Sequence, residues 1–249
     1  MHIIKKDKGM KIKSLDEFIL FENEDYIVIN KPYGIASLQE RDTSRVSIQQ
    51  LANEYIETAQ LCHRLDKETS GALALAKNPE AYKNLSGQFA KRKVNKTYHA
   101  FVDGLAEFNE FECDLPIAIS GKGKVRIDKQ EGKKSSTVFN TLETYNKHSL
   151  VECKPKTGRM HQIRIHLAAS KHSIISDEQY GGNMLYLSQI KPKFRNGKYE
   201  EEQPLIKRVA LHAFKLGFTG LDGAEIVAEA PYPKDLKALK NQLKKVTKR

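Results

Sequence analysis

The chain has little of the residue types that mark secreted, membrane or disulfide-linked proteins. It contains no tryptophan and three cysteines in 249 residues. Cys62, Cys113 and Cys153 are odd in number and lack the paired spacing of a zinc site or a disulfide framework, so we expect reduced thiols. No apolar run approaches the roughly 20 residues of a membrane span, and the N-terminal MHIIKKDKGM has no signal-peptide core. These absences predict a cytoplasmic protein with no membrane partner.

Motifs for a bound nucleotide or metal are also missing. The stretch Gly121-Lys-Gly-Lys124 lacks the spacing and the trailing Ser or Thr of a phosphate-binding loop. Three histidines, His161, His166 and His172, invite a metal interpretation, but they lack the HExxH spacing and have no Cys or carboxylate on the same turns. The sequence therefore predicts no metal site and no nucleotide cofactor.

The composition is that of a basic globular protein. Hydrophobic residues make up 39% of the chain and charged residues 29%, and 42 Lys and Arg against 31 Asp and Glu give a net charge of +11. This balance favours a polyanionic partner, because Lys and Arg that neutralise phosphates release counterions. Many basic proteins only carry solvated lysines, so the charge alone leaves a nucleic-acid partner open.

Hydrophobic periodicity predicts a mixture of strands and helices. Strands are expected at 18–21 and 26–30 as a hairpin, at 71–76, at 97–102, in several short pieces within 112–154, and at 211–218 and 224–228. Helices are expected after Ser47, with Ile48, Leu51, Tyr55 and Ile56 as the apolar positions, after Asn78-Pro79, over 160–167 and over 236–246. Polar segments at 38–45 and 187–206 are expected to be loops. The pattern predicts a basic α+β protein with a basic arm at 1–16, and a length of 249 residues suits one large domain or two small ones.

The two last helices carry informative faces. In the first, Met160, Ile163 and Leu167 recur at helical spacing, which turns Arg164 sideways rather than into the core. In the C-terminal helix an apolar stripe is surrounded by lysines. That helix either caps the sheet or touches RNA, and we favour capping with the lysines solvated.

The most informative stretch is HRLDKETSG, from His63 to Gly71. Asp66 lies there on a connection before a short apolar strand, with Arg64 two positions earlier and Lys67 next to it. Opposite charges of this kind would keep the carboxylate ionised, and an ionised Asp can act as a nucleophile or base. The alternative is a solvated loop with a weak surface ion pair. Composition does not decide between these interpretations.

The same stretch closely resembles the signature of the RluA-like pseudouridine synthases, which isomerise uridine to pseudouridine in structured RNA. Two further stretches, KTYHAFVDG at 96–104 and PKTGRMHQIRIHL at 155–167, are similar to the second and third motifs of that family, with Met160 where Thr is usual. The opening ILFENEDYIVINKPYGI resembles the family's first hairpin, and 173–182 resembles its strand and glycine turn after the third motif. The resemblance covers about 18–233.

The resemblance implies a single α+β catalytic domain, 17–249, with a bent, mixed and mainly antiparallel sheet, helices around a basic cleft, and no separate N-terminal RNA-binding domain. It implies a catalytic role for Asp66 as the nucleophile, for Tyr98 against the target base, and for Arg164 as the partner of Asp66. The substrate-binding residues that it implies are His63, Arg64, Thr69, Arg159, His161 and Gln162, with Arg64 filling the space left by a flipped nucleotide. The partner would be ribosomal or transfer RNA, no cofactor would be needed, and we expect a monomer.

Two other functions remain open from the sequence. A non-catalytic RNA-binding protein could use the same surface, although such a surface would not need a carboxylate facing phosphate. A glycosidase would need two suitably spaced carboxylates, and Glu68 is only a weak second candidate beside Asp66.

Overall fold

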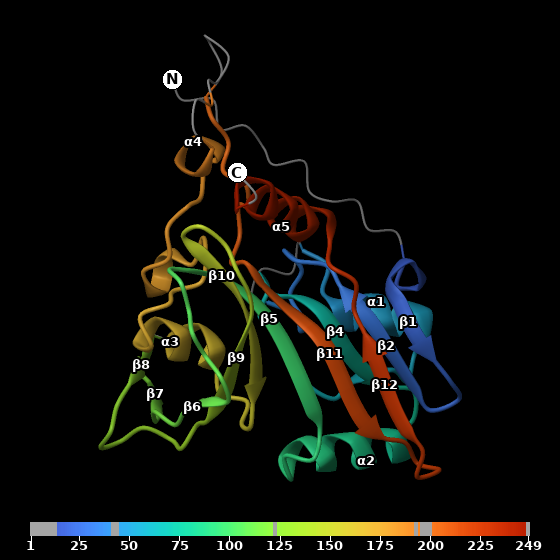
Figure 1. Ribbon diagram of the computed structural model, residues 1–249. Coiled ribbons are helices and arrows are strands. Elements are labelled where there is room, and N and C mark those ends of the chain that lie inside the picture. The colour runs from blue at the N-terminus through green and yellow to red at the C-terminus, as the bar shows by residue number, and fades with distance from the viewer. Residues whose placement is uncertain (1–13, 41–44, 122–123, 192–193, 195–200, 248–249) are drawn as a thin grey trace.

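A computed structural model describes residues 14–40, 45–121, 124–191, 194 and 201–247 (Figure 1). Most of the expected N-terminal arm, and parts of the expected loops at 38–45 and 187–206, lie outside these residues. In the described part of the chain, no helix is both long and apolar enough to cross a bilayer.

One large bent sheet organises the molecule. Within the described residues it has ten strands in the order β1-β2-β4-β11-β5-β10-β9-β6, with β3 beside β4 and β12 beside β11. Its strands are β1 (Ile19–Glu22), β2 (Tyr26–Lys31), β3 (Gln60–Leu61), β4 (Ser70–Ala76), β5 (Asn95–Asp103), β6 (Phe111–Cys113), β9 (Thr137–Thr144), β10 (His148–Pro155), β11 (Leu211–Thr219) and β12 (Glu225–Glu229). β7 (Ile117–Ile119) and β8 (Val125–Ile127) form a separate hairpin. Only β4 and β11 pair in parallel, which confirms the predicted mixed, mainly antiparallel α+β fold.

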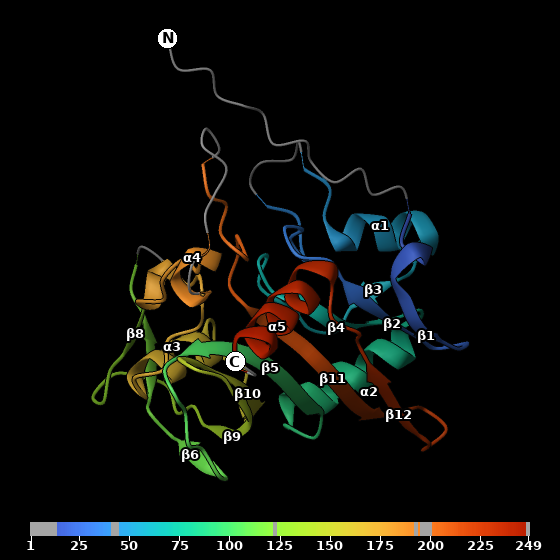
Figure 2. The same cartoon turned by 45° about the horizontal axis from the view of Figure 1, so that its top comes forward.

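Helices cover both faces of this sheet. They are α1 (Ile48–Tyr55), α2 (Pro79–Ala90), α3 (Gln162–Ala169), α4 (Leu187–Ile190) and α5 (Lys234–Thr247), with short 3-10 turns at Asp16–Phe18 and Glu178–Tyr180. Figures 1 and 2 show α5 crossing one face of the central strands, with α2 on the other side. Two helix starts confirm the prediction, because Ser47 forms a capping box with Gln50, and the Asn78 side chain accepts a hydrogen bond from the Ala81 N–H.

β4 is buried on both faces, as its uninterrupted apolar run predicts. Leu73 and Leu75 pack with the buried face of α1, whereas the alternating alanines of the strand pack with α2. Since the Asp66 loop leads directly into β4, this two-sided burial gives the loop a rigid support.

Gly71 lies at the parallel contact between β4 and β11. Its φ is +118°, and a Cβ there would collide with the backbone of Ala213. Gly34 also has a positive φ, of +79°, but has open space around the Cβ position. We expect Gly71→Ala to cost about 3 kcal/mol or more, because overpacking of about 1–3 adds to a left-handed backbone penalty of about 1–2 kcal/mol.

Urea unfolding of Gly71→Ala, with Gly34→Ala as the matched control, tests this expectation. The control bears only the backbone penalty and should lose about 1–2 kcal/mol. Equal losses in the two variants would show that the close approach of β4 and β11 carries no cost.

α5 caps the sheet. Its stripe of Leu236, Leu239, Leu243 and Val246 is buried, and the three leucines belong to the same core as β5 and β10. Two of its lysines, Lys240 and Lys244, pair with Glu143 of β9. The favoured interpretation of this helix is confirmed.

Several expected elements are wrong in detail. α3 begins at Gln162, so Met160 precedes the helix and packs with the β7–β8 hairpin instead of joining the stripe. Tyr55 of α1 is exposed rather than buried. The expected loop at 187–206 contains α4, and the expected strand after α3 is reduced to a single bridge at Ile174. Met160 and Tyr55 lie at helix ends, where packing outweighs periodicity.

Candidate active site

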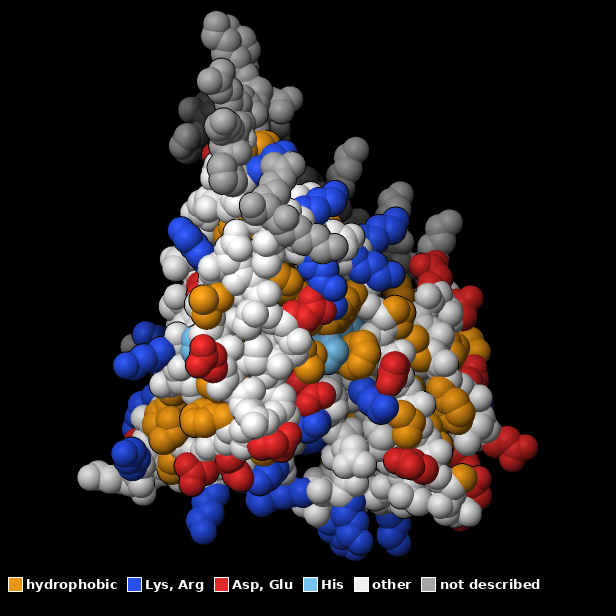
Figure 3. Space-filling model, viewed as in Figure 1, with side chains coloured by type: hydrophobic (Ala, Val, Ile, Leu, Met, Phe, Trp, Pro, Cys, Tyr) orange, Lys and Arg blue, Asp and Glu red, His pale blue; other side chains and the backbone are white. Residues whose placement is uncertain are grey.

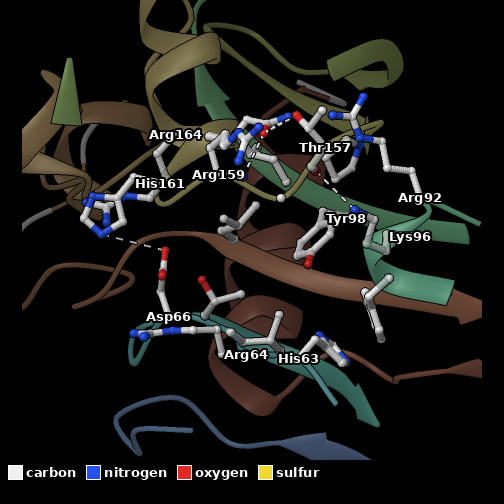
Figure 4. A pocket seen from close by; sticks show the side chains of 18 of the residues that line it. His63, Arg64, Asp66, Arg92, Lys96, Tyr98, Thr157, Arg159, His161 and Arg164 are labelled. Carbon is white, nitrogen blue, oxygen red and sulfur yellow. Dashed lines mark hydrogen bonds and ion pairs between the residues drawn. The ribbon is translucent and has the colours of Figure 1, made fainter. Parts of the chain in front are cut away.

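The three motifs meet around one cavity of about 520 Å³ (Figure 4). The loop before β4 supplies Asp66, β5 supplies Tyr98, and α3 supplies Arg164. Five cationic residues line the cavity, namely Arg64, Arg92, Lys96, Arg159 and Arg164, whereas Asp66 is its one acidic lining residue among those described. Figure 3 shows further Lys and Arg side chains gathered along the lower edge of the molecule. The site therefore places a single carboxylate in positively charged surroundings.

The backbone around Asp66 is fixed by hydrogen bonds. Its carbonyl accepts from the Thr69 N–H at 3.0 Å, which closes a tight turn. The Ser37 hydroxyl accepts from the Leu65 N–H at 3.0 Å and donates to the Leu65 carbonyl at 2.8 Å. The segment that follows β2 therefore sets the position of the loop.

Lys31 also holds the Asp66 loop in place. Its ammonium is fully buried and donates to the carbonyls of Pro32, Lys67 and Thr69 at 2.9, 3.2 and 2.9 Å. Burial, together with the nearby charge of Arg208, lowers the pKa of Lys31 from 10.5 to about 7. Three carbonyls match the three N–H donors of the charged ammonium.

Arg208 is a second buried cation that contacts the Asp66 loop. Its side chain is 2% exposed, pairs with Asp235 of α5 at 2.8 Å and donates to the Glu68 carbonyl at 3.2 Å. Its guanidinium carbon lies 4.6 Å from the centre of the Tyr33 ring. The sequence analysis missed both Lys31 and Arg208. A signal was available for Lys31, a cation that closely follows the apolar run from Tyr26 to Ile29.

The Asp66 carboxylate has few contacts of its own. It is 30% exposed, and the titratable side chain beside it is His161, whose Nε2 lies 3.9 Å from Oδ2. Among the described residues, no hydrogen bond to this carboxylate is formed. Lys67 was expected to help keep it charged, but Lys67 pairs with Glu40 at 2.6 Å. Arg64 lies at the exposed rim of the cavity.

The expected ion pair between Arg164 and Asp66 is wrong. Arg164 instead makes two hydrogen bonds of 2.7 Å to Asp177, whose side chain is 1% exposed, and a third of 3.2 Å to Gln179. Arg164 is also buried rather than turned sideways. A planar guanidinium binds one carboxylate in bidentate fashion, and the fully buried Asp177 needs this compensation more than the partly solvated Asp66.

Gln162 lines the cavity, but its amide is bonded to the protein itself. It is buried, and its amide oxygen accepts from the Thr157 hydroxyl and the Arg159 N–H. Its amide nitrogen donates to the Ser136 carbonyl and the Thr137 hydroxyl. With both donors and both acceptor positions in use, Gln162 holds the loop between β10 and α3 in place.

His63 and Thr69 line the cavity but also serve the fold. The His63 Nε2 accepts from the Ala74 N–H at 3.0 Å, and its ring stacks on Phe89 with the ring centres 4.4 Å apart. Burial lowers the pKa of His63 to about 3, so its ring is neutral. Thr69 is buried at the end of the Asp66 turn.

Tyr98 presents a neutral phenol to the cavity. Burial, and to a lesser extent the charge of Asp66, raises the pKa of its hydroxyl. In the described part of the chain, this hydroxyl has no hydrogen-bond partner. The neighbouring Lys96 donates to the Thr157 carbonyl at 3.1 Å, and burial, followed by Arg92, lowers its pKa to about 8. Lys96 and Arg92 are cavity residues that the sequence analysis missed, although both lie close to the second motif.

His161 lies at the start of α3 with a left-handed φ of +53°. Its Nδ1 is 2.9 Å from the Tyr180 hydroxyl, and the guanidinium carbon of Arg164 lies 4.9 Å from the centre of the Tyr180 ring. Tyr180 was not expected at the site, because the sequence offered it only as part of a glycine turn.

The histidines that invited a metal interpretation make other contacts. No group of three or more His, Cys, Asp or Glu side chains in the described residues is placed to hold an ion. His166 bonds to the Leu115 carbonyl, and His172 to the Asp103 carbonyl.

Comparisons with known proteins agree with the motifs. Residues 25–169, more than half of the chain, match the sequence family described as RNA pseudouridylate synthase. The chain is 33% identical to ribosomal large subunit pseudouridine synthase D of Neisseria meningitidis over 88% of its own length and 59% of that protein. It is 34% identical to ribosomal large subunit pseudouridine synthase C of Escherichia coli, over 94% of this chain and 72% of that protein. The structure of human RNA pseudouridylate synthase domain containing 1 superposes with a TM-score of 0.68 at 26% identity, covering 90% of this chain and 87% of that chain.

Proposed function

The chain belongs to the RNA pseudouridylate synthase family, and from that membership we propose that it isomerises uridines of structured RNA, ribosomal or transfer, to pseudouridine. The observation that carries the proposal is the lone Asp66 carboxylate in a cavity lined by five Lys and Arg residues and by Tyr98. The names of the bacterial relatives favour large-subunit ribosomal RNA as the substrate.

Pseudouridine formation breaks the N-glycosidic bond, turns the uracil and rejoins it to the sugar through carbon, with no net redox change. In the proposed mechanism Asp66 acts as the nucleophile or the proton-handling carboxylate at the sugar. The carboxylate accepts no hydrogen bond from the part of the chain that the structure describes, which supports this role, because donors to a carboxylate lower its basicity. The hydrogen bond from the Thr69 N–H to the Asp66 carbonyl fixes the backbone from which the Asp66 side chain extends.

A stacked or paired uridine hides its sugar–base bond, so the nucleotide has to leave the helix. Unstacking costs a few kcal/mol, which contacts to the RNA backbone have to offset. In this proposal the cations that line the cavity contact phosphates, and Arg64, which lies at the exposed rim, fills the vacated space. Tyr98 then stacks on the flipped base, a contact worth about 1–3 kcal/mol.

The other two functions fit the site less well. A binding surface alone gains nothing from a carboxylate in the middle of its cations. A glycosidase needs a second carboxylate, and Glu68 does not line the cavity, although its carbonyl is held by Arg208.

Tritium release tests the proposal. When C5 of uracil becomes bonded to the sugar, the C5 hydrogen is lost, so RNA transcribed with 5-tritiated uridine should release tritium to water. We would use unmodified transcripts of large-subunit ribosomal RNA and of transfer RNAs. Free uracil without pseudouridine would indicate a glycosidase, and RNA binding without release from either RNA would indicate a binding protein.

Lys31 gives the activity and the stability opposite pH dependences. As the pH rises through about 7 the amine loses one of its three donors, so a loop carbonyl is released and turnover should fall. Stability relative to Lys31→Met should instead rise from about pH 7 towards 10.5. In that range the unfolded chain binds the proton that the folded protein has lost.

Turnover and denaturant unfolding of the unmutated protein and of Lys31→Met, measured below and above neutral pH, test whether activity falls while stability rises. Lys96→Met is the matched control, because Lys96 has a pKa of about 8 and titrates in the same range. A fall in turnover that disappears in Lys96→Met would assign the titration to Lys96 instead.

A further inference from the structure

A chain of side chains leads from the buried interior to the proposed catalytic carboxylate. Asp177 binds Arg164, Arg164 lies over the ring of Tyr180, Tyr180 hydrogen-bonds His161, and His161 faces Asp66. Figure 4 shows His161 and Asp66 directed towards one another from opposite sides of the cavity. Each contact in the chain is between residues from different turns or elements, so the geometry is set by the tertiary fold.

The position of the proton on His161 follows from its two neighbours. If Nδ1 carried the proton, the lone pair of Nε2 would face the Asp66 carboxylate, which is also an acceptor. If the Tyr180 hydroxyl donates to Nδ1, the Nε2–H points at Asp66 and both contacts are favourable. Burial and the charge of Arg164 lower the pKa of His161, so the ring is neutral.

We propose that His161 is a positioning residue for the Asp66 carboxylate, and that Tyr180 sets the tautomer of His161 by keeping its proton on Nε2. The effect on catalysis rests on the proposed function, whereas the proton position does not. Tyr180 lies outside the three motifs.

The need for such a residue is visible in the cavity. The Asp66 loop is fixed in its backbone, but its carboxylate forms no hydrogen bond among the described residues. The separation of 3.9 Å from His161 becomes a hydrogen bond of ordinary length after a movement of about 1 Å. His161 can thus hold the Asp66 carboxylate in one orientation by a hydrogen bond that forms only after this movement. The basicity of the carboxylate is not lowered while the bond is absent.

The backbone at His161 supports this interpretation. A φ of +53° is uncommon for a residue with a side chain, and costs about 1–2 kcal/mol. The strained conformation brings the ring to Tyr180 on one side and Asp66 on the other. Strain of this kind persists where surrounding contacts determine the conformation.

Nitrogen NMR of the full chain labelled at histidine tests the proton position without any RNA. We expect His161 in the Nε2–H form, with Nδ1 unprotonated, and we expect the preference to weaken in Tyr180→Phe. This substitution removes the hydroxyl and keeps the ring under Arg164. An Nδ1–H form in the unmutated protein would overturn the proposal.

Single-turnover rates at saturating RNA test the role in catalysis, with a 5-tritiated transcript of large-subunit ribosomal RNA as the probe. His161→Asn, which tolerates a left-handed backbone, should slow the step about 10²-fold, as misplacement by about 1 Å can. Tyr180→Phe should slow it about 10-fold, since the ring of His161 remains. The double variant should be no slower than His161→Asn alone, and His161→Gln, whose longer side chain can bring its amide donor closer to Asp66 than Asn can, should recover part of the rate.

The outcomes separate three roles. RNA affinity should change less than about twofold in these variants. Weakened affinity at an unchanged rate would make His161 an RNA contact, and multiplied effects in the double variant would show that Tyr180 acts independently of His161. If the unmutated protein releases no tritium, the proposed function fails, and the NMR result still decides the proton position.

Discussion

Asp66→Asn should abolish pseudouridine formation while leaving the fold and the RNA affinity in place. The substitution is nearly isosteric and removes the charged oxygen that the proposed chemistry uses at the sugar. The carboxylate accepts no hydrogen bond from the described residues, so its loss disturbs no structural contact. We expect tritium release to fall by about 10⁴-fold or more, as when a catalytic nucleophile is removed.

Glu68→Gln is the matched control for this variant. Glu68 lies two residues away on the same loop, its carbonyl accepts a hydrogen bond from Arg208, and its side chain does not line the cavity. Glu68→Gln should therefore keep its turnover. Near-normal turnover in Asp66→Asn, or a comparable loss in Glu68→Gln, would remove Asp66 from the centre of the mechanism.

The local features around Asp66 could be predicted from the sequence because they depend on short-range physics. An apolar run bounded by turn residues predicts β4, and Asn78 before Pro79 predicts the start of α2. These signals lie within a few residues of the features that they determine. The motif resemblance added which of the many polar residues take part in one site.

The ionic contacts of the site could not be predicted in the same way. Two carboxylates, Asp66 and Asp177, are within the electrostatic reach of Arg164, and the sequence gives no measure of which one is more deeply buried. Burial decides the choice, because an unpaired charge costs more in the interior than at a solvated cavity wall. The partner that the motif suggested was therefore the wrong one.

Contacts between distant segments explain what else was missed. Lys31 reaches the loop across 36 residues of sequence, and Arg208 reaches it across 140. Neither has an acidic neighbour in sequence that would suggest burial with pairing. Their acceptors on the loop are backbone carbonyls, which every residue carries, so the sequence has no pattern that identifies the acceptors, even though Lys31 itself stands out after an apolar run.

Arg164→Met should cause the largest loss of stability in the site. The substitution leaves the Asp177 carboxylate, 1% exposed, without the two hydrogen bonds of 2.7 Å that now compensate its burial. Breaking a buried pair by removing one partner costs about 3–5 kcal/mol. Activity should fall as well, because the guanidinium also lies over the ring of Tyr180, which holds His161 beside Asp66.

Arg159→Met provides the contrast for Arg164→Met, since both are cavity-lining arginines near the start of α3. Arg159 is half-buried and pairs with no carboxylate in the described residues, and its one outward contact is a long hydrogen bond of 3.4 Å to the Lys134 carbonyl. Its removal should leave the melting temperature nearly unchanged, weaken RNA binding and reduce the salt dependence of binding by about one phosphate contact. Melting temperature and salt-dependent RNA affinity, measured for both variants, distinguish the two roles.

Adding Asp177→Asn to Arg164→Met should recover part of the lost stability, because the unpaired charge of Asp177 is the cause of the loss. If the double variant is no more stable than Arg164→Met, the loss comes from the missing packing of the arginine and not from the carboxylate that it neutralises.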